Sequence, residues 1–475
     1  MSDAGERCVD AALAAARASG LAQLVVAGRA LAAHEAAFDS THAFSAARAE
    51  ERFMLERPCA SVALAALGAS AVVESDGADR LELASAQLRE QAARTHAAPG
   101  ADARWVGGFA FAHEAPREDG PWRAFGSCRF VLPRALLARD PRGARLAWST
   151  RIEPGDPREV ALAALDAARA EAEAWAHAAA HSQPPARSDA SPLRLLRPAR
   201  GYRRLVSEAL DAIAKGEIDK LVVARAIDCR GVRAPVAHIL RALRATHPRG
   251  ATFALAPHAS FERRGPAFLG TTPELLVRLA GGVVEAQALA GSARRGRSAA
   301  RDSRARSTLF ASAKERAEHE HVVASLRSAL APLCDALSEP AAPRPLAAGD
   351  VEHLETRVCG RLAPSAYASA LDLAARLHPS PAVAGAPREA AARWLAANEP
   401  LERGWYAGAI GWQDARGDGE LFVALRCALL RGEHARLYAG AGIVAGSQPA
   451  AEQRETRLKL RTVFHALRET SHARG

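Results

Sequence analysis

The run Leu221-Val-Val-Ala-Arg-Ala-Ile227 has the length of a β-strand, and its apolar, β-branched residues favour an extended chain. Phe422 to Leu429 is a second apolar run of strand length. Lys314 to Leu330 and Glu452 to Leu467 instead place apolar residues at helical spacing, with charges on the other side. Strand runs joined by turns and by helices, without a regular βαβ alternation, favour an α+β fold with largely antiparallel sheets.

The composition is typical of a globular protein, with 49% hydrophobic and 24% charged residues among 475. No stretch approaches the roughly 20 apolar residues that cross a bilayer, and Ala11 to Ala16 lacks the basic start of a signal peptide. A cytoplasmic protein without a membrane partner is therefore expected. Seven scattered cysteines without a C-x-x-C motif argue against a disulfide framework or a zinc site.

The formal net charge of +10 comes from arginines that are spread along the whole chain among acidic residues. No basic block with interleaved aromatic residues is present, so a small anionic ligand is favoured over a nucleic acid. The clearest change in composition is the polar, proline-bearing stretch at 181–198, which contains Gln183-Pro-Pro185. It predicts an exposed connection between residues 1–180, whose signals are weak, and residues 199–472.

Two carboxylate pairs stand out, Glu315 with Glu318 and Glu452 with Glu455. On a helix, residues three apart project from one face. If the two faces meet across a cleft, their oxygens suit a hard divalent cation such as Mg²⁺, which binds one or two carboxylates and keeps several waters. Taken alone, such pairs are more often solvated helix faces.

Three further features are ambiguous by themselves. Gly440-Ala-Gly442 lets backbone N–H groups approach an anion closely, although a tight turn is the commoner explanation. Gly291 in Ala288-Leu-Ala-Gly-Ser-Ala293 allows the same two interpretations. His353 is either a substrate-contacting imidazole or a hydrogen-bonded structural histidine.

Lysine is scarce, with only Lys215, Lys220, Lys314 and Lys459 among 63 basic residues. This suggests a background preference for arginine wherever either residue would serve. A lysine that persists against it is a candidate for a role that arginine cannot fill, above all the loss of a proton.

In order and spacing, these segments resemble the chorismate-utilising enzymes, the family of isochorismate, anthranilate, aminodeoxychorismate and salicylate synthases. The resemblance covers residues 200 to 470 closely and is weaker upstream, where Gly107-Gly-Phe-Ala-Phe111 is the best match. The matching stretches are Asp219-Lys-Leu-Val-Val-Ala-Arg225, Phe268-Leu-Gly-Thr-Thr-Pro-Glu-Leu275, Leu289-Ala-Gly-Ser-Ala-Arg294, Lys314-Glu-Arg-Ala-Glu-His319, His353-Leu354, Leu377-His-Pro-Ser-Pro381, Arg403-Gly-Trp-Tyr-Ala-Gly408, Ala439-Gly-Ala-Gly-Ile-Val444 and Glu455-Thr456.

The resemblance implies a single large α+β unit of two related halves, like component I of anthranilate synthase, with packed antiparallel sheets flanked by helices. It also implies a site. Glu318 and Glu455 would contact Mg²⁺, with Glu315 and Glu452 holding its water shell, and the metal would bind the ring carboxylate of chorismate. Arg426, on the strand Phe422 to Leu429, would bind the enolpyruvyl carboxylate. The remaining substrate contacts would come from Gly291, His353, Tyr406, Gly440, Gly442 and Lys459.

Lys220 would be the general base and Glu274 the general acid. Adding water at carbon 2 while the carbon-4 hydroxyl departs needs a base on one side of the ring and an acid on the other. Lys220 must lose its proton before it can accept one from water, and Glu274 must hold its proton until the hydroxyl leaves.

Branches of the family differ in the nucleophile. Lys220 is suited to activating water, and Ala290 stands where the aminodeoxychorismate branch has a lysine. Water as nucleophile implies isochorismate synthase, an isomerase, with no glutamine amidotransferase partner. Salicylate synthase, which also eliminates pyruvate, is the alternative, and an inactive chorismate-binding protein is a third. A monomer is expected, and the product would serve siderophore, salicylate or menaquinone synthesis.

Overall fold

The computed structural model describes residues 3–46, 51–181, 193–196, 201–257, 265–296, 298–340 and 342–471. Most of the connection predicted at 181–198 lies outside these ranges. Its described part contains Arg194 and Leu195, which are exposed and pair with Arg230 and Cys229 at the edge of a sheet.

The strands form two sheets, and apart from β1 with β5 all the neighbouring strands described are antiparallel. The larger sheet has 13 strands in the order β10 (Arg194–Leu195), β11 (Lys220–Arg230), β23 (His434–Ile443), β22 (Cys427–Arg431), β13 (Ala267–Thr272), β12 (Ala251–Ala256), β2 (Arg52–Arg57), β3 (Val62–Leu67), β8 (Ala135–Asp140), β9 (Gly143–Ile152), β1 (Gln23–Ala30) and β5 (Thr95–Ala97), with β19 (Gly385–Ala386) beside β11. The smaller sheet has 10 strands in the order β16 (Cys334–Ser338), β18 (Val351–Leu362), β15 (Val283–Arg294), β14 (Leu275–Ala280), β21 (Gly419–Val423), β20 (Ala409–Asp414), β6 (Arg104–Phe109), β7 (Cys128–Leu132) and β4 (Ala71–Ser75), with β17 (Arg344–Ala348) beside β18.

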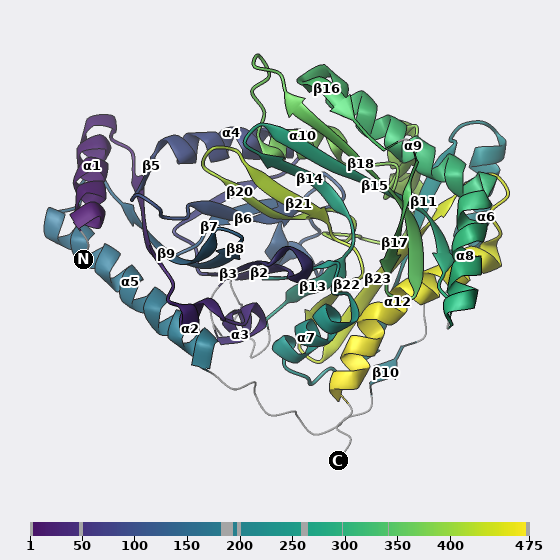
Figure 1. Ribbon diagram of the computed structural model, residues 1–475, viewed down its shortest axis with the longest axis horizontal. Coiled ribbons are helices and arrows are strands. Elements are labelled where there is room, and N and C mark those ends of the chain that lie inside the picture. The colour runs from purple at the N-terminus through teal and green to yellow at the C-terminus, as the bar shows by residue number, and fades with distance from the viewer. Residues whose placement is uncertain are drawn as a thin grey trace.

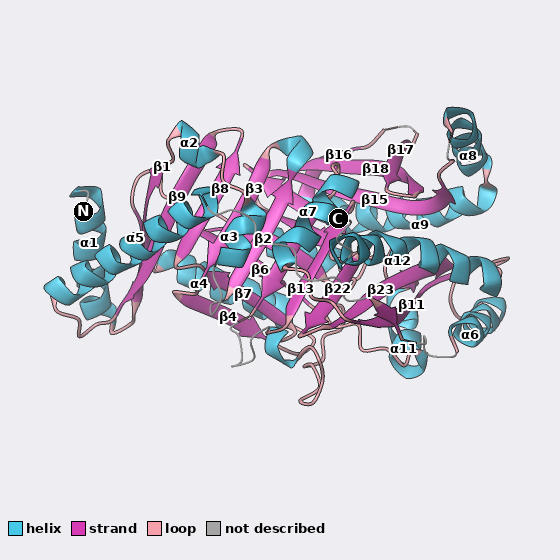
Figure 2. Cartoon of the chain, turned by 90° about the horizontal axis from the view of Figure 1, so that it is seen from below, coloured by secondary structure: helices cyan, strands magenta, loops and turns pink. Residues whose placement is uncertain are grey.

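Helices flank the two packed sheets (Figures 1 and 2). Figure 2 shows α5, α3, α7 and α12 lying across the larger sheet, and in Figure 1 α4 and α10 lie on the opposite side of the molecule. The α-helices are α1 (Asp3–Ser19), α2 (Ala33–Ala36), α3 (Ser40–Ala46), α4 (Arg80–Ala93), α5 (Arg158–His181), α6 (Tyr202–Ala214), α7 (Val236–Thr246), α8 (Ala299–Ala311), α9 (Ala313–Leu330), α10 (Ala370–Leu377), α11 (Arg388–Asn398) and α12 (Pro449–Ser471). Short 3₁₀ turns occur at Pro58–Ala60, Arg123–Phe125 and Ala331–Leu333. None of the described helices combines the length and the apolar character of a membrane span.

The main hydrophobic core lies between the sheets and contains residues of both, such as Phe253 and Phe268 of the larger sheet and Phe109 and Phe130 of the smaller one. Central strands are buried on both faces because helices cover the outer side. This explains why β12 and β13 are apolar or small at nearly every position instead of alternating. Both sheets take strands from each part of the chain, so the α+β fold expected from the sequence is confirmed.

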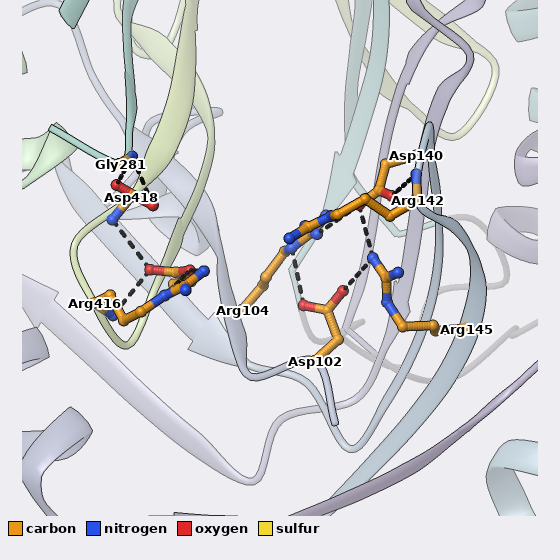
Figure 3. A network of polar contacts seen from close by, with 9 residues as sticks. Asp102, Arg104, Asp140, Arg142, Arg145, Gly281, Arg416 and Asp418 are labelled. Atoms are coloured by element: carbon orange, nitrogen blue, oxygen red, sulfur yellow. Dashed lines mark hydrogen bonds and ion pairs between the residues drawn. The ribbon is translucent and has the colours of Figure 1, made fainter. Parts of the chain in front are cut away.

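Ion pairs tie the two sheets together where β6 begins and β8 ends (Figure 3). Arg104 of β6 in the smaller sheet contacts Asp102 at 2.9 Å and Asp140 of β8 in the larger sheet at 3.3 Å. Arg145 of β9 lies 2.7 Å from the same Asp140 carboxylate. In a separate group in that view, the Asp418 carboxylate accepts the backbone N–H of Gly281, which joins two turns of the smaller sheet.

The predicted strand Phe422 to Leu429 is wrong, because the chain passes from one sheet to the other within it. Phe422 belongs to β21 of the smaller sheet, whereas Leu429 belongs to β22 of the larger one. Arg426 lies between them with φ at +44°, outside the extended region. An apolar run of eight residues does not reveal such a crossing, because both strand ends are buried.

Candidate active site

The candidate active site is a cavity that lies where the two sheets meet α9 and α12. It is partly open to solvent and is lined by residues of both sheets, of α9 and of α12. Its walls come from segments far apart in the chain and consist of Val222, Pro273, Glu274, Leu289, Ala290, Gly291, Ser292, Glu318, His353, Ala382, Val383, Tyr406, Ala407, Leu425, Arg426, Tyr438, Ala439, Gly440, Gly442, Glu455 and Lys459.

Most of the predicted site residues are therefore brought together. Lys220, Glu315 and Glu452 are the predicted residues that do not line the cavity, and each lies next to one that does. Glu315 accepts the backbone N–H of Ser292 at 2.7 Å, and Glu452 is buried on α12 one turn before Glu455.

The glycines of β23 leave room for neighbouring side chains rather than forming a turn. Gly440 and Gly442 pair with Ala224 and Val222 of β11. A Cβ atom on Gly442 would lie 2.5 Å from Oε1 of Glu318, and one on Gly440 would lie 3.0 Å from the hydroxyl of Tyr406. Both contacts are closer than real Cβ atoms tolerate without a shift, so the absence of a side chain at these positions shapes the cavity.

A chain of hydrogen bonds fixes the guanidinium of Arg426. Its NH2 group donates to Nε2 of His353 at 3.1 Å, and Nδ1 of His353 donates to the carbonyl oxygen of Gly291 at 3.3 Å. Burial and the nearby Arg426 hold the pKa of His353 well below its usual range, so the ring is neutral. Burial also lowers the pKa of Arg426, to about 10, which still leaves it charged at neutral pH.

The backbone at Gly291 makes this arrangement possible. Gly291 has φ at +74° and forms a β-bulge in β15 between Ala290 and Ser292, opposite β18. A bulge of this kind inserts one extra residue and changes the direction of the neighbouring groups. Here it aims the carbonyl oxygen of Gly291 at His353.

Two lysines neutralise the two cavity carboxylates that were predicted to bind metal. Nζ of Lys220 lies 2.9 Å from Oε1 of Glu318, and Nζ of Lys459 lies 2.7 Å from Oε1 of Glu455. Lys459 also donates to the carbonyl oxygen of Gly440 at 2.9 Å. The first pair joins two elements, since β11 supplies Lys220 and α9 supplies Glu318. Both residues of the second pair lie on α12.

Lys220 lies behind the cavity wall. Its side chain is completely buried, and its Nζ makes no hydrogen bond of acceptable geometry to the described residues despite the short distance to Glu318. A buried amine with an incomplete hydrogen-bond set is costly in its charged form. A Cβ atom on Gly442 would lie 2.5 Å from Oε1 of Glu318 and 3.2 Å from Cε of Lys220, so the glycine leaves room for both side chains.

Glu274 is buried and lines the cavity at the start of the loop that follows β13. Burial raises the pKa of Glu274 to about 8, and the positive charges of Lys220 and Lys459 oppose part of that rise. At neutral pH this carboxyl group therefore carries a proton that it can donate.

Sequence reasoning missed two structural supports of the site. Arg403 is buried and ion-paired with Glu399 through its Nε and NH2 groups, and it donates to the carbonyl oxygens of Val383 and Val222. Tyr438 stacks on Tyr406 with 5.3 Å between ring centroids and 15° between planes. Arg403 lies within a family-like stretch, but its partners come from segments distant in sequence.

A magnesium ion would fit the oxygen donors of this cavity. Glu318 and Glu455 reach it from two helices, and hard oxygen ligands with retained waters suit Mg²⁺. Within the described ranges, no three His, Cys, Asp or Glu side chains form a ready-made metal cluster. Two carboxylates completed by water and by an anionic ligand are compatible with that finding.

The chain matches the sequence model of the family described as "Chorismate binding enzyme" over residues 12–468. It is 37% identical over 370 residues to the salicylate biosynthesis isochorismate synthase of Pseudomonas aeruginosa, which covers 77% of this chain and 74% of that protein. It is 38% identical over 270 residues to the isochorismate synthase DhbC of Bacillus subtilis, across 56% of this chain and 67% of that one. The solved structure of MenF, the menaquinone-specific isochorismate synthase of Escherichia coli, has the same fold, with a TM-score of 0.75, 24% identity and coverage of 98% of this chain and 100% of that one.

Proposed function

Because this chain belongs to the family of chorismate-binding enzymes, we propose that it is an isochorismate synthase, an isomerase that converts chorismate to isochorismate. The observation that carries the proposal is the pairing of a protonated acid with a buried amine at one cavity. Glu274 retains its proton near neutral pH, and Lys220 lies behind the adjoining wall, 2.9 Å from the cavity residue Glu318.

In the proposed reaction, Lys220 takes a proton from water as the oxygen bonds to carbon 2 of the ring. The ring double bond shifts, the bond from carbon 4 to its hydroxyl breaks, and Glu274 gives its proton to the departing hydroxide. One water enters and one leaves, so no ammonia and no glutamine amidotransferase are needed. As the base, Lys220 accepts this proton on Nζ, which lies 2.9 Å from Oε1 of the cavity residue Glu318.

The carboxylates of the substrate need cationic groups and N–H donors. Arg426, held by His353, presents a planar guanidinium that can bind one carboxylate through two hydrogen bonds. Lys459, Tyr406 and the β23 residues Gly440 and Gly442 line the same cavity. These contacts orient the ring between the base and the acid, which is where most of the rate gain from positioning originates.

We also propose that Glu318 and Glu455 hold Mg²⁺, with Glu315 and Glu452 positioning its waters. When bound, the ion would neutralise a substrate carboxylate and polarise the ring. Lys220 and Lys459, which now pair with these carboxylates, would give up part of that interaction to the metal. A monomeric, cytoplasmic enzyme completes the proposal.

The test is incubation of purified protein with chorismate and MgCl₂, without an ammonia source, followed by chromatography of the products. Isochorismate that reaches a reversible plateau and is lost with EDTA supports the proposal. Salicylate with pyruvate would move the protein to salicylate synthases. Bound but unchanged chorismate, measured by calorimetry, would refute catalysis.

A further inference from the structure

A second cavity adjoins the catalytic one. It is partly open to solvent and is lined by Thr246, His247, Pro248, Arg249, Gly250, Pro273, Arg295, Leu346, Ala347, Ala348, Gly349, Asp350, Arg461, Thr462 and His465. Pro273, which precedes the general acid Glu274, lines both cavities. The two spaces therefore share a wall at the loop that carries the acid.

Two other elements run from one cavity to the other. On α12, Lys459 lines the catalytic cavity and Thr462 the second one, and three residues of helix advance by only about 4.5 Å. On the smaller sheet, Leu346 of β17 pairs directly with His353 of β18. The two cavities thus share Pro273 and are lined by neighbouring residues of α12 and of the smaller sheet.

His247 stands at the boundary. It is buried, its Nδ1 lies 3.0 Å from Oγ1 of Thr246, and burial together with the charge of Arg426 lowers its pKa to about 4. Arg426 lines the catalytic cavity and His247 lines the second one. The charge of Arg426 therefore contributes to the electrostatic potential in both cavities.

The charges around the second cavity favour an anion. The guanidiniums of Arg249 and Arg461 are exposed and, within the described part of the chain, have no carboxylate or hydrogen-bond partner. This is unusual here, because many arginines of this protein are ion-paired, as Arg295 of the same cavity is with Asp302 at 2.9 Å. Among the described residues that line this cavity, Asp350 is the single carboxylate.

We propose that this second cavity is the entrance through which the anionic substrate reaches the catalytic cavity, and that Arg249 and Arg461 steer it there. The inference rests on the proposed function for the identity of the substrate. A dianion about 10 Å from one guanidinium in water is favoured about three- to fourfold at low salt, and screening removes most of this effect at high salt. Steering acts on the association rate, so kcat/KM changes while kcat does not.

Cys59 provides a reporter of the local potential that does not depend on catalysis. It is exposed, and its Sγ lies 3.9 Å from the backbone oxygen of Arg249, at the rim of the cavity. The first measurement compares the rates at which anionic and cationic methanethiosulfonates modify Cys59, followed by peptide mass spectrometry, with Cys8 as internal reference. In the double variant Arg249→Gln/Arg461→Gln, the ratio of the anionic to the cationic modification rate should fall several-fold at Cys59. The same ratio at Cys8 should not change.

The second measurement is kcat/KM for chorismate as a function of ionic strength. The double variant should lose about tenfold at low salt, keep its kcat and show a flatter salt dependence. Arg431→Gln, an exposed arginine at the end of β22, is the matched control and should behave like wild type. Leu346→Trp, which fills the cavity, should lower kcat/KM without changing the Cys59 ratio.

Each outcome decides between the alternatives. An unchanged Cys59 ratio refutes the cationic entrance. A changed ratio with unaltered kcat/KM in both the double variant and Leu346→Trp also refutes it, and assigns the cavity to a separate anion. A wild-type protein that forms no isochorismate refutes the proposed function and, with it, the substrate named for this entrance.

Discussion

Replacing Glu274 by glutamine tests the acid at the centre of the proposed reaction. The substitution keeps the shape of the side chain but removes the proton that would leave with the hydroxyl. With a pKa of about 8, about nine-tenths of the Glu274 carboxyls are protonated at pH 7, whereas at the ordinary value of 4.5 only about 0.3% would be, a difference of about 300-fold. Loss of a general acid typically costs a factor of about 10² to 10⁴ in rate.

On the alkaline side of the pH–rate profile, kcat of the wild-type protein should therefore be constant below pH 8. Above pH 8 it should fall about tenfold per pH unit, as Glu274 ionises. Glu274→Gln should lower kcat by at least about 100-fold and abolish that limb. The assay follows isochorismate by chromatography from pH 6 to pH 9.5 at saturating Mg²⁺. Glu433→Gln, at an exposed ion pair with Arg233, is the control.

The same residue makes a separate prediction about stability. Because the folded pKa of Glu274 is raised, its contribution is fully present below pH 4.5 and is lost as pH rises through about 8. In thermal unfolding experiments, the melting temperature of Glu274→Gln should rise relative to that of the wild-type protein between pH 6 and pH 9. The reasoning is refuted if the variant keeps more than a tenth of kcat, or if its rate still falls near pH 8.

Three further predictions concern the other groups of the site. Lys220→Arg keeps the charge but cannot give up a proton, so kcat should fall by at least about 100-fold; an active arginine variant, measured by product formation, would show that only the charge matters. Gly442→Ala places a Cβ 2.5 Å from Oε1 of Glu318, so it should weaken activation by Mg²⁺ and lower the free energy of unfolding by about 1–3 kcal/mol. The control is Gly155→Ala, whose Cβ would have no atom within 4 Å. The control should change neither the Mg²⁺ titration nor the denaturation curve. EDTA should abolish turnover and Mg²⁺ restore it, and Glu318→Gln and Glu455→Gln should each raise the Mg²⁺ concentration for half-maximal rate; full activity in EDTA would contradict the metal assignment.

Local patterns in the sequence correctly predicted the elements that carry the site. The apolar spacing of Lys314 to Leu330 and of Glu452 to Leu467 corresponds to α9 and α12, and Leu221 to Ile227 lies within β11. Helical periodicity and strand composition are local properties, so they can be read without knowing the partners. The resemblance to a family then named ten of the 21 residues that line the cavity.

The crossing at Arg426 was missed for the opposite reason. Phe422 to Leu429 is apolar except for Arg426, and only the positions of the two sheets show that the chain leaves one and joins the other. The positive φ of Arg426 and its bond to His353 follow from that crossing. Neither is encoded in the spacing of the residues nearby.

The sequence by itself determined the α+β class, the helical carboxylate pairs and the set of chemical groups available, because each depends on residues close together in the chain. Only the tertiary structure decided the protonation of Glu274, the burial of Lys220 against Glu318 and the position of a second cavity that shares Pro273 with the first. Burial and electrostatic interaction depend on distances between segments that may be hundreds of residues apart. Those distances exist only after both sheets and their covering helices have packed.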